Sequence, residues 1–190
     1  MISSKLIPNA NFHNKLGTEY STDIHKVASM KQTHSNVVLE IKESGVYEAD
    51  ALVTTKKNLM LVVSTADCMP VVLSDDIKIG IIHIGWKGIE NKIFFNTIKK
   101  FNKKKLKISI GPHAKSCCYE IQDDLKIKFP DYTIERDNKK FLDLSGDIST
   151  FCKKNNIELE IANECTIEDI TFNSYRRDKT SLRQKSTIWI

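Results

Sequence analysis

The chain has little glycine and proline and no long run of apolar residues. Its 190 residues include seven glycines and four prolines, and neither forms a cluster that would mark a linker. We therefore expect one domain over residues 1–190. No apolar run approaches the length of a membrane-spanning helix, and the first eight residues lack the apolar core of a signal peptide. The sequence thus predicts a cytoplasmic protein that makes no membrane contact.

The chain also lacks a strong charge of either sign and a regular cysteine pattern. Lys and Arg total 29 and Asp and Glu total 24, a formal net charge of +5, which suits anionic small molecules without requiring nucleic acid. The lysines between residues 99 and 107 lack aromatic neighbours placed to stack bases, so we interpret them as a solvated helix end. The five cysteines are odd in number and irregularly spaced, which argues against a disulfide framework.

Short apolar segments typical of strands outnumber the helical patterns, and the two kinds do not alternate strictly. Helical spacing of apolar residues predicts helices over about 89–101, from Ile121 to a stop at Pro130, and from Leu144 to Cys152. Residues 1–27 are polar and weakly patterned, and 42–47 is interpreted as a turn. The strand-like segments are 37–41, 49–55, 59–63, 69–74, 77–84, 106–110, 157–161 and 186–190. This order is typical of an α+β fold with mixed sheets.

The apolar segments 69–74 and 77–84 are predicted to form a hairpin, because the aspartates between them are good turn residues. A turn centred on Asp75 and Asp76 would pair residues whose numbers sum to 151, and would place Cys68 opposite His83. A three-residue turn would instead place Cys68 opposite Ile84. The first register is a suitable starting geometry for a shared metal ion.

His34, Cys68 and His83 are candidate zinc ligands. Each lies where an apolar strand meets small or polar residues. Thiolate and imidazole are zinc ligands, and three protein ligands leave a fourth position for water or substrate. The alternative is a buried cysteine and two hydrogen-bonded histidines with no metal.

A second thiol pair, Cys117-Cys118, follows the turn Gly111-Pro112-His113. One of these thiols, or His113, is a candidate fourth zinc ligand, and a thiolate with a histidine base is a candidate nucleophile. We prefer a third interpretation, in which a helix begins here and the cysteines are a small buried pair.

A cluster of arginines near the C-terminus is suited to bind an anion. Arg176, Arg177 and Arg183 carry planar guanidinium groups that match phosphate or carboxylate. The alternative is an exposed ion-pair network with Asp178 and Glu168.

Six blocks of sequence together resemble the YfiH or laccase-domain family, also labelled multicopper polyphenol oxidase or purine nucleoside phosphorylase. The resemblance covers about residues 28–190, and its most specific blocks are Ala66-Asp67-Cys68 and His83-Ile84-Gly85-Trp86. The others are Gln32-Thr33-His34, Ala49-Asp50-Ala51, Cys117-Cys118-Tyr119-Glu120 and Ser174-Tyr175-Arg176-Arg177-Asp178. It implies an α+β fold of two packed mixed sheets flanked by helices, in α/β/β/α layers.

The resemblance also implies a site and an activity. The family's metal ligands carry over onto His34, Cys68 and His83, with zinc favoured over copper. The implied activity is phosphorolysis of purine nucleosides such as adenosine, inosine and methylthioadenosine, with adenosine deamination as a second reaction. We take Cys68, His83 and Asp67 as candidate catalytic residues, with Asp67 orienting a ligand histidine. The partners are then purine nucleosides and phosphate, for a monomer or weak homodimer.

Copper oxidase chemistry needs more histidines than this chain has. The sequence contains five, too few for a blue-copper centre and a further copper cluster. Two alternatives to the phosphorylase are a hydrolase that edits peptidoglycan precursors with the same Cys/His site, and a structural zinc module with a basic binding helix. The chain departs from the family in its shortened N-terminal segment, in Lys87 where arginine is common, and in Asn173.

Overall fold

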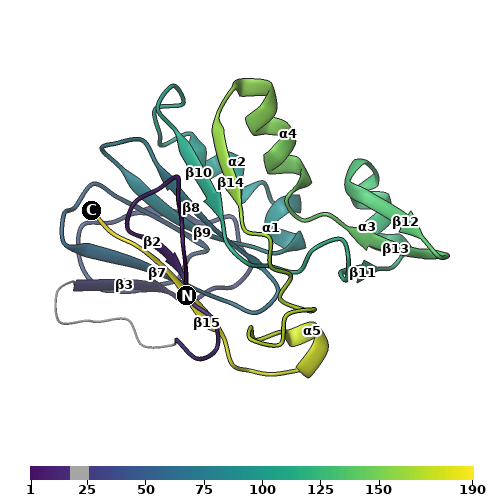
Figure 1. The fold of residues 1–190 in the computed structure, drawn as a ribbon. Helices are drawn as coiled ribbons and strands as arrows, with labels where there is room; N and C mark the ends of the chain where they lie inside the picture. Colours follow the sequence, from purple (N-terminus) through teal and green to yellow (C-terminus); the bar gives the residue numbers. More distant parts are fainter. Residues whose placement is uncertain (18–25) are drawn as a thin grey trace.

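The computed structural model describes residues 1–17 and 26–190, and two six-stranded mixed sheets dominate it (Figure 1). The first sheet has the order β1 (Ile2–Ser3), β2 (Ala10–Phe12), β15 (Gln184–Ile188), β7 (Leu59–Thr65), β3 (Lys26–Met30) and β5 (Gly45–Tyr47). The second has the order β14 (Glu158–Ile161), β10 (Lys107–Ile110), β8 (Met69–Ser74), β9 (Ile79–Ile84), β6 (Ala51–Thr54) and β4 (Val38–Glu40). These sheets confirm the predicted α+β class.

The remaining elements are short. A small antiparallel sheet has the order β11 (Glu120–Ile121), β13 (Lys139–Leu142) and β12 (Thr133–Arg136). The helices are α1 (Trp86–Glu90), α2 (Ile93–Ile98), α3 (Asp123–Lys128), α4 (Gly146–Asn155) and α5 (Tyr175–Asp178), with one turn of 3-10 helix at Pro130–Tyr132.

Two buried clusters show how the layers stack. Between the sheets, Phe12 and Leu61 of the first sheet pack with Val72 and Ile81 of the second. On the other face of the second sheet, a larger cluster joins its strands to α2 and α4, which lie beside β10 and β14 in Figure 1. Strand β8 contributes to both clusters, because successive side chains point to opposite faces. Burial on both faces explains why its sequence is a continuous apolar run.

The predicted helix over 89–101 is wrong in its bounds. The structure has two helices here, separated at Asn91 and Lys92, and Lys92 has a left-handed φ of 58°. The amides of both residues bond back to carbonyls of α1, which ends that helix. The chain then turns so that Ile93 and Phe94 enter the core.

Two other predictions also need correction. The segment 42–47 is not only a turn, because it contains the edge strand β5. The polar segment 1–27 contains β1, β2 and the start of β3, while residues 18–25 of it lie outside the described part of the chain.

The hairpin between β8 and β9 exists, but neither predicted register is right. Pro70 faces His83 and Ser74 faces Ile79, so paired numbers sum to 153. The reason is a four-residue loop, in which the Asp75 carboxylate accepts the N–H groups of Ile77 and Lys78. Cys68 therefore lies just beyond the last pair of the ladder.

The topology brings two chain crossings to one end of the sandwich. Strands β3 and β7 are parallel neighbours, so their C-terminal ends meet at the same edge of the first sheet. From that edge the chain passes to the second sheet twice, through residues 31–37 into β4 and through 66–68 into β8. Strand β9 runs antiparallel to β8 and ends at the same place. Side chains from three remote segments therefore meet at this edge.

Glu160 ties the N-terminal segment to the second sheet. Its carboxylate accepts hydrogen bonds from the hydroxyls of Ser4 and Ser109 and from the N–H groups of Lys5 and Leu6. Partial burial raises the pKa of Glu160, but these donors outweigh burial and hold it below the ordinary value of 4.5.

We therefore expect Glu160→Gln to lower the free energy of unfolding by about 1 kcal/mol near neutral pH. A depressed carboxylate pKa stabilises the fold above the unfolded-state pKa, and this contribution disappears as pH falls through the folded-state pKa. Denaturant unfolding of both proteins at about pH 6 and about pH 3 measures this. A difference in unfolding free energy between the two proteins that is larger at the lower pH would contradict the stabilising role of the Glu160 carboxylate.

Candidate functional site

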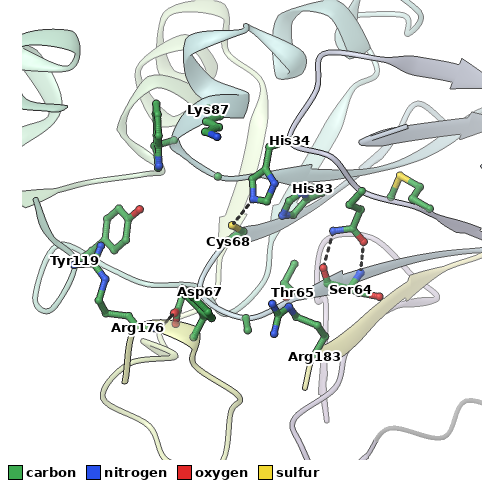
Figure 2. A pocket seen from close by; sticks show the side chains of 16 residues that line it. His34, Ser64, Thr65, Asp67, Cys68, His83, Lys87, Tyr119, Arg176 and Arg183 are labelled. Atoms are coloured by element: carbon green, nitrogen blue, oxygen red, sulfur yellow. Dashed lines mark hydrogen bonds between the residues drawn. The ribbon is translucent and has the colours of Figure 1, made fainter. Parts of the chain in front are cut away.

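His34, Cys68 and His83 converge at the edge where the chain crosses between the sheets. Their ligand atoms all lie within 4.8 Å of one another, and His34 Nε2 is 3.8 Å from Cys68 Sγ (Figure 2). His83 comes from β9, while His34 and Cys68 come from the two crossings. His83 is buried, Cys68 is half-buried and His34 is exposed, so the cluster is open on one side.

Asp50 organises two of the three side chains. Its Oδ1 atom is 2.7 Å from His83 Nδ1, which leaves Nε2 of that ring for the cluster. The same buried carboxylate accepts the N–H groups of Thr33, His34 and Ser35 and the Ser35 hydroxyl. It thereby holds the loop on which His34 adopts a left-handed φ of 60°. A carboxylate behind a histidine is the usual partner of a metal-binding imidazole.

The electrostatics of the cluster favour a thiolate. Burial raises the pKa of the Cys68 thiol, but hydrogen bonds with His34 and His83 outweigh burial and lower it from 9.0 to about 7. Burial lowers the pKa of His83, while Asp50 and Cys68 together raise it to about 9. Thiolate is the form of cysteine that binds metal ions. The two imidazoles and one thiolate thus fit a metal that prefers nitrogen and sulfur.

Gly85 allows this close approach. A Cβ atom at this position would lie 2.9 Å from Cys68 Sγ and 3.3 Å from a carbon of the His34 ring. A side chain here would therefore push two of the candidate ligands away.

The sequence predicts that Asp67 orients a ligand histidine, but the structure gives Asp67 other partners. Its carboxylate accepts the Thr166 hydroxyl at 2.8 Å and the Arg176 N–H at 2.6 Å. Asp67 thus connects the crossing that carries Cys68 to the start of α5, and Asp50 has the orienting position. The sequence signal for Asp50 is its place in the Ala49-Asp50-Ala51 block, which by itself predicts no role.

A cavity of about 640 Å³ extends from the cluster, within the size range of small-molecule sites. Figure 2 shows the labelled side chains His34, Cys68, Tyr119, Arg176 and Arg183 around it. Trp86, Lys87, Thr65 and Asp67 also line it. One space therefore holds the candidate metal ligands, aromatic walls and two guanidinium groups.

The three predicted anion-binding arginines have different surroundings. Arg176 and Arg183 line the cavity, and Arg177 does not. The Arg177 guanidinium donates to the carbonyls of Thr166, Ile167 and Phe172 and to the Asp178 carboxylate. These contacts occupy its donors, so Arg177 fixes the loop before α5.

Neither Cys117, Cys118 nor His113 joins the three-ligand cluster. His113 is buried, its Nδ1 atom donates to the Gly111 carbonyl at 2.8 Å, and burial lowers its pKa to about 4. The prediction of a helix N-terminus with a buried cysteine pair is also wrong. Cys117 is exposed, Cys118 is half-buried, and both lie in a turn before β11. Among the described residues, the His34–Cys68–His83 cluster therefore has three protein ligands rather than the four of a closed zinc site.

Comparison with known proteins places the chain in a family. The sequence profile described as "Multi-copper polyphenol oxidoreductase laccase" matches residues 9–190. The chain belongs to this family. The family name refers to copper, yet among the described residues only two imidazoles converge on the thiolate.

Relatives and solved structures agree with this membership. A purine nucleoside phosphorylase of Aquifex aeolicus is 33% identical over 165 residues, which are 84% of this chain and 80% of that protein. One from Clostridium acetobutylicum is 37% identical over 178 residues, 84% of this chain and 74% of that protein. The crystal structure of Bacillus licheniformis YfiH has a TM-score of 0.79 at 25% identity and covers 89% of this chain and 76% of its own. The Neisseria meningitidis protein NMB0706 has a TM-score of 0.77 at 27% identity, covering 87% and 75%.

No helix among the described residues is both long and apolar enough to cross a membrane.

Several lysines of the 99–107 run are exposed, and Lys100 and Lys105 pair with Glu40 and Asp76. These contacts agree with the interpretation of the run as a solvated surface.

Proposed function

We propose that the protein is a zinc-dependent purine nucleoside phosphorylase that acts on adenosine, inosine and methylthioadenosine. The observation that carries the proposal is a cavity that joins a Cys/His ligand set to two arginines. Phosphorolysis requires a nucleoside and an anionic nucleophile in one space, and this lining suits both. The names of the similar Aquifex and Clostridium proteins support the same reaction.

His34, Cys68 and His83 are the residues that would hold the zinc ion. Three protein ligands are typical of catalytic rather than structural zinc sites. When bound, zinc supplies a Lewis acid with an open coordination position. Asp50 keeps His83 in one tautomer and fixes the His34 loop, so the chain presents its ligands in a prearranged form.

Arg176 and Arg183 are proposed to bind phosphate. Within the described part of the chain, the Arg176 guanidinium donates to the Glu120 carbonyl and lies 4.9 Å from the centre of the Tyr119 ring. Arg183 donates through one terminal nitrogen to the carbonyls of Thr180 and Leu182. Both groups retain donors for an anion, and each is held in place by the carbonyls.

The purine would lie against the aromatic part of the cavity. Trp86 and Tyr119 are half-buried and line the same space as the arginines. Flat apolar rings provide stacking area for a base, while Lys87 and the arginines provide positive charge for the phosphate.

The test is an assay of zinc-loaded protein with adenosine and with inosine, each with and without phosphate. We expect free adenine or hypoxanthine only when phosphate is present, because phosphate is the nucleophile. Conversion of adenosine to inosine without phosphate would show deamination by the same site. Bound zinc without turnover of either nucleoside would overturn the proposal and favour the peptidoglycan-editing alternative.

Replacing Arg183 with methionine should raise the KM for phosphate about 10- to 100-fold, because one charged hydrogen-bond donor to the anion is lost. The KM for the nucleoside should change much less. Steady-state kinetics gives the phosphate KM when phosphate is varied at saturating inosine, and the nucleoside KM when inosine is varied at saturating phosphate. Arg177→Met is the matched control: because Arg177 fixes the loop before α5 and does not line the cavity, this variant should lower thermal stability and raise the phosphate KM much less than Arg183→Met does. Equal effects of the two variants on that KM would contradict the assignment.

A further inference from the structure

A second set of potential metal ligands lies outside the cavity. Cys117, Cys118, Cys165 and Glu168 place three thiols and one carboxylate within 4.8 Å of one another. Cys118 Sγ is 3.3 Å from Cys117 Sγ, and Cys117 Sγ is 3.7 Å from Glu168 Oε2. Two thiolates on one tetrahedral zinc, each at about 2.3 Å, are about 3.8 Å apart. The distance between the Cys117 and Cys118 sulfur atoms is thus close to that expected for two thiolates bound to one ion.

Backbone pairing fixes the two loops that carry these side chains. His113 and Cys165 form a parallel bridge, and the Thr166 N–H donates to the His113 carbonyl at 3.1 Å. The Asp169 N–H donates to the Cys165 carbonyl at 2.8 Å. Arg177 holds the carbonyls of Thr166 and Ile167 in the same loop. The ligand atoms are therefore brought together by the fold before any ion binds.

The three thiols of this cluster crowd one another. Burial raises the pKa of Cys165, but N–H donors, among them that of Lys115 at 3.4 Å from Sγ, outweigh burial and lower it. Burial and the neighbouring thiols raise the pKa of Cys117. The nearby Arg136 guanidinium donates to the Cys117 carbonyl at 2.8 Å rather than to a sulfur atom. A bound cation would stabilise the thiolate forms that crowding disfavours.

We propose that Cys117, Cys118, Cys165 and Glu168 bind one zinc ion in a closed, structural site. Three thiolates and a carboxylate complete a four-ligand set without an open position. Binding releases the thiol protons to solvent, so it consumes no oxidant or reductant. The site would cross-link the turn that leads to Tyr119 with the loop that leads to α5, and both border the cavity. This site is separate from the His34–Cys68–His83 cluster and does not depend on the proposed reaction.

Zinc stoichiometry of the reduced, full-length protein tests the proposal. We expect about two zinc ions per chain in the wild type, about one in Cys68→Ser, about one in Cys117→Ser and none in the double variant. Cys117 is exposed, so its replacement should leave the fold intact. Cys152→Ala is the matched control: this cysteine is buried outside both clusters, and the variant should keep both ions.

Cobalt substitution gives a second readout that does not involve activity. In Cys68→Ser the remaining cobalt should show a thiolate charge-transfer band about threefold stronger than in Cys117→Ser. The reason is that the site left in Cys68→Ser has three sulfur ligands, whereas the site left in Cys117→Ser has one. A wild type with one zinc ion that Cys68→Ser loses would overturn the proposal. Weak zinc binding that neither Cys117→Ser nor Glu168→Gln changes would also overturn it. A disulfide within this cluster in the freshly reduced protein would do the same.

Discussion

Replacing Cys68 with serine is expected to abolish phosphate-dependent release of the purine base, with a fall of at least about 1,000-fold in kcat/KM. The thiolate is the one soft ligand among His34, Cys68 and His83, and a serine hydroxyl remains protonated and binds zinc poorly at neutral pH. The same variant should lose the zinc of this cluster. Steady-state kinetics on zinc-loaded protein, with metal analysis after desalting, measures both effects.

His83→Ala should repeat this double loss, because it removes the ligand that Asp50 holds in place. Cys152→Ala serves as the control for changing a thiol, since Cys152 lies in the helix-side core away from the cavity. This variant should retain the zinc of the cluster and should also retain turnover. A Cys68→Ser protein that binds no zinc there and still turns over inosine at the wild-type rate would refute a metal-dependent reaction.

Replacing Asp50 with asparagine should weaken zinc binding about 10- to 100-fold, the usual cost of removing a carboxylate behind a ligand histidine. Asparagine has nearly the same shape, but it loses the charge that orients the His83 ring and that accepts the N–H groups of the His34 loop. Competition for zinc against a chelator of known affinity gives the dissociation constant. Activity should return at high zinc concentration, because the ligands themselves remain.

Asp67→Asn is the control for this prediction. Asp67 lies next to Cys68, but its oxygens bind Thr166 and the Arg176 N–H rather than a histidine. This variant should leave the zinc dissociation constant nearly unchanged and instead disturb the start of α5, raising the KM for phosphate. A larger loss of zinc affinity in Asp67→Asn than in Asp50→Asn would show that Asp67, rather than Asp50, orients the ligand histidine.

Apolar patterning alone predicted most of the second sheet. Strand β8 matches its predicted segment, and β9, β10 and β14 differ at their ends, because long buried runs bounded by turn residues leave few other structures. Helix bounds were less well determined. Lys92 gave no sequence signal for its left-handed conformation, and that break depends on how Ile93 and Phe94 enter the core.

The residue types in the sequence nominated His34, Cys68 and His83, since thiol and imidazole groups at strand ends indicate metal chemistry. The geometry offered in support was wrong, because the Asp75 loop has four residues and shifts the register to a sum of 153. What brings the three together is the parallel pairing of β3 with β7, which sends both crossings over the same edge.

The sequence by itself therefore determined the chemical groups, and the tertiary structure decided their partners. The orienting role of Asp50, the enclosed donors of Arg177 and the meeting of Cys165 with Cys117 all depend on contacts between residues far apart in the chain. Local patterns report which way a side chain points along its own strand or helix. Which remote side chain it meets is fixed by strand order and register, which depend on the whole packed core.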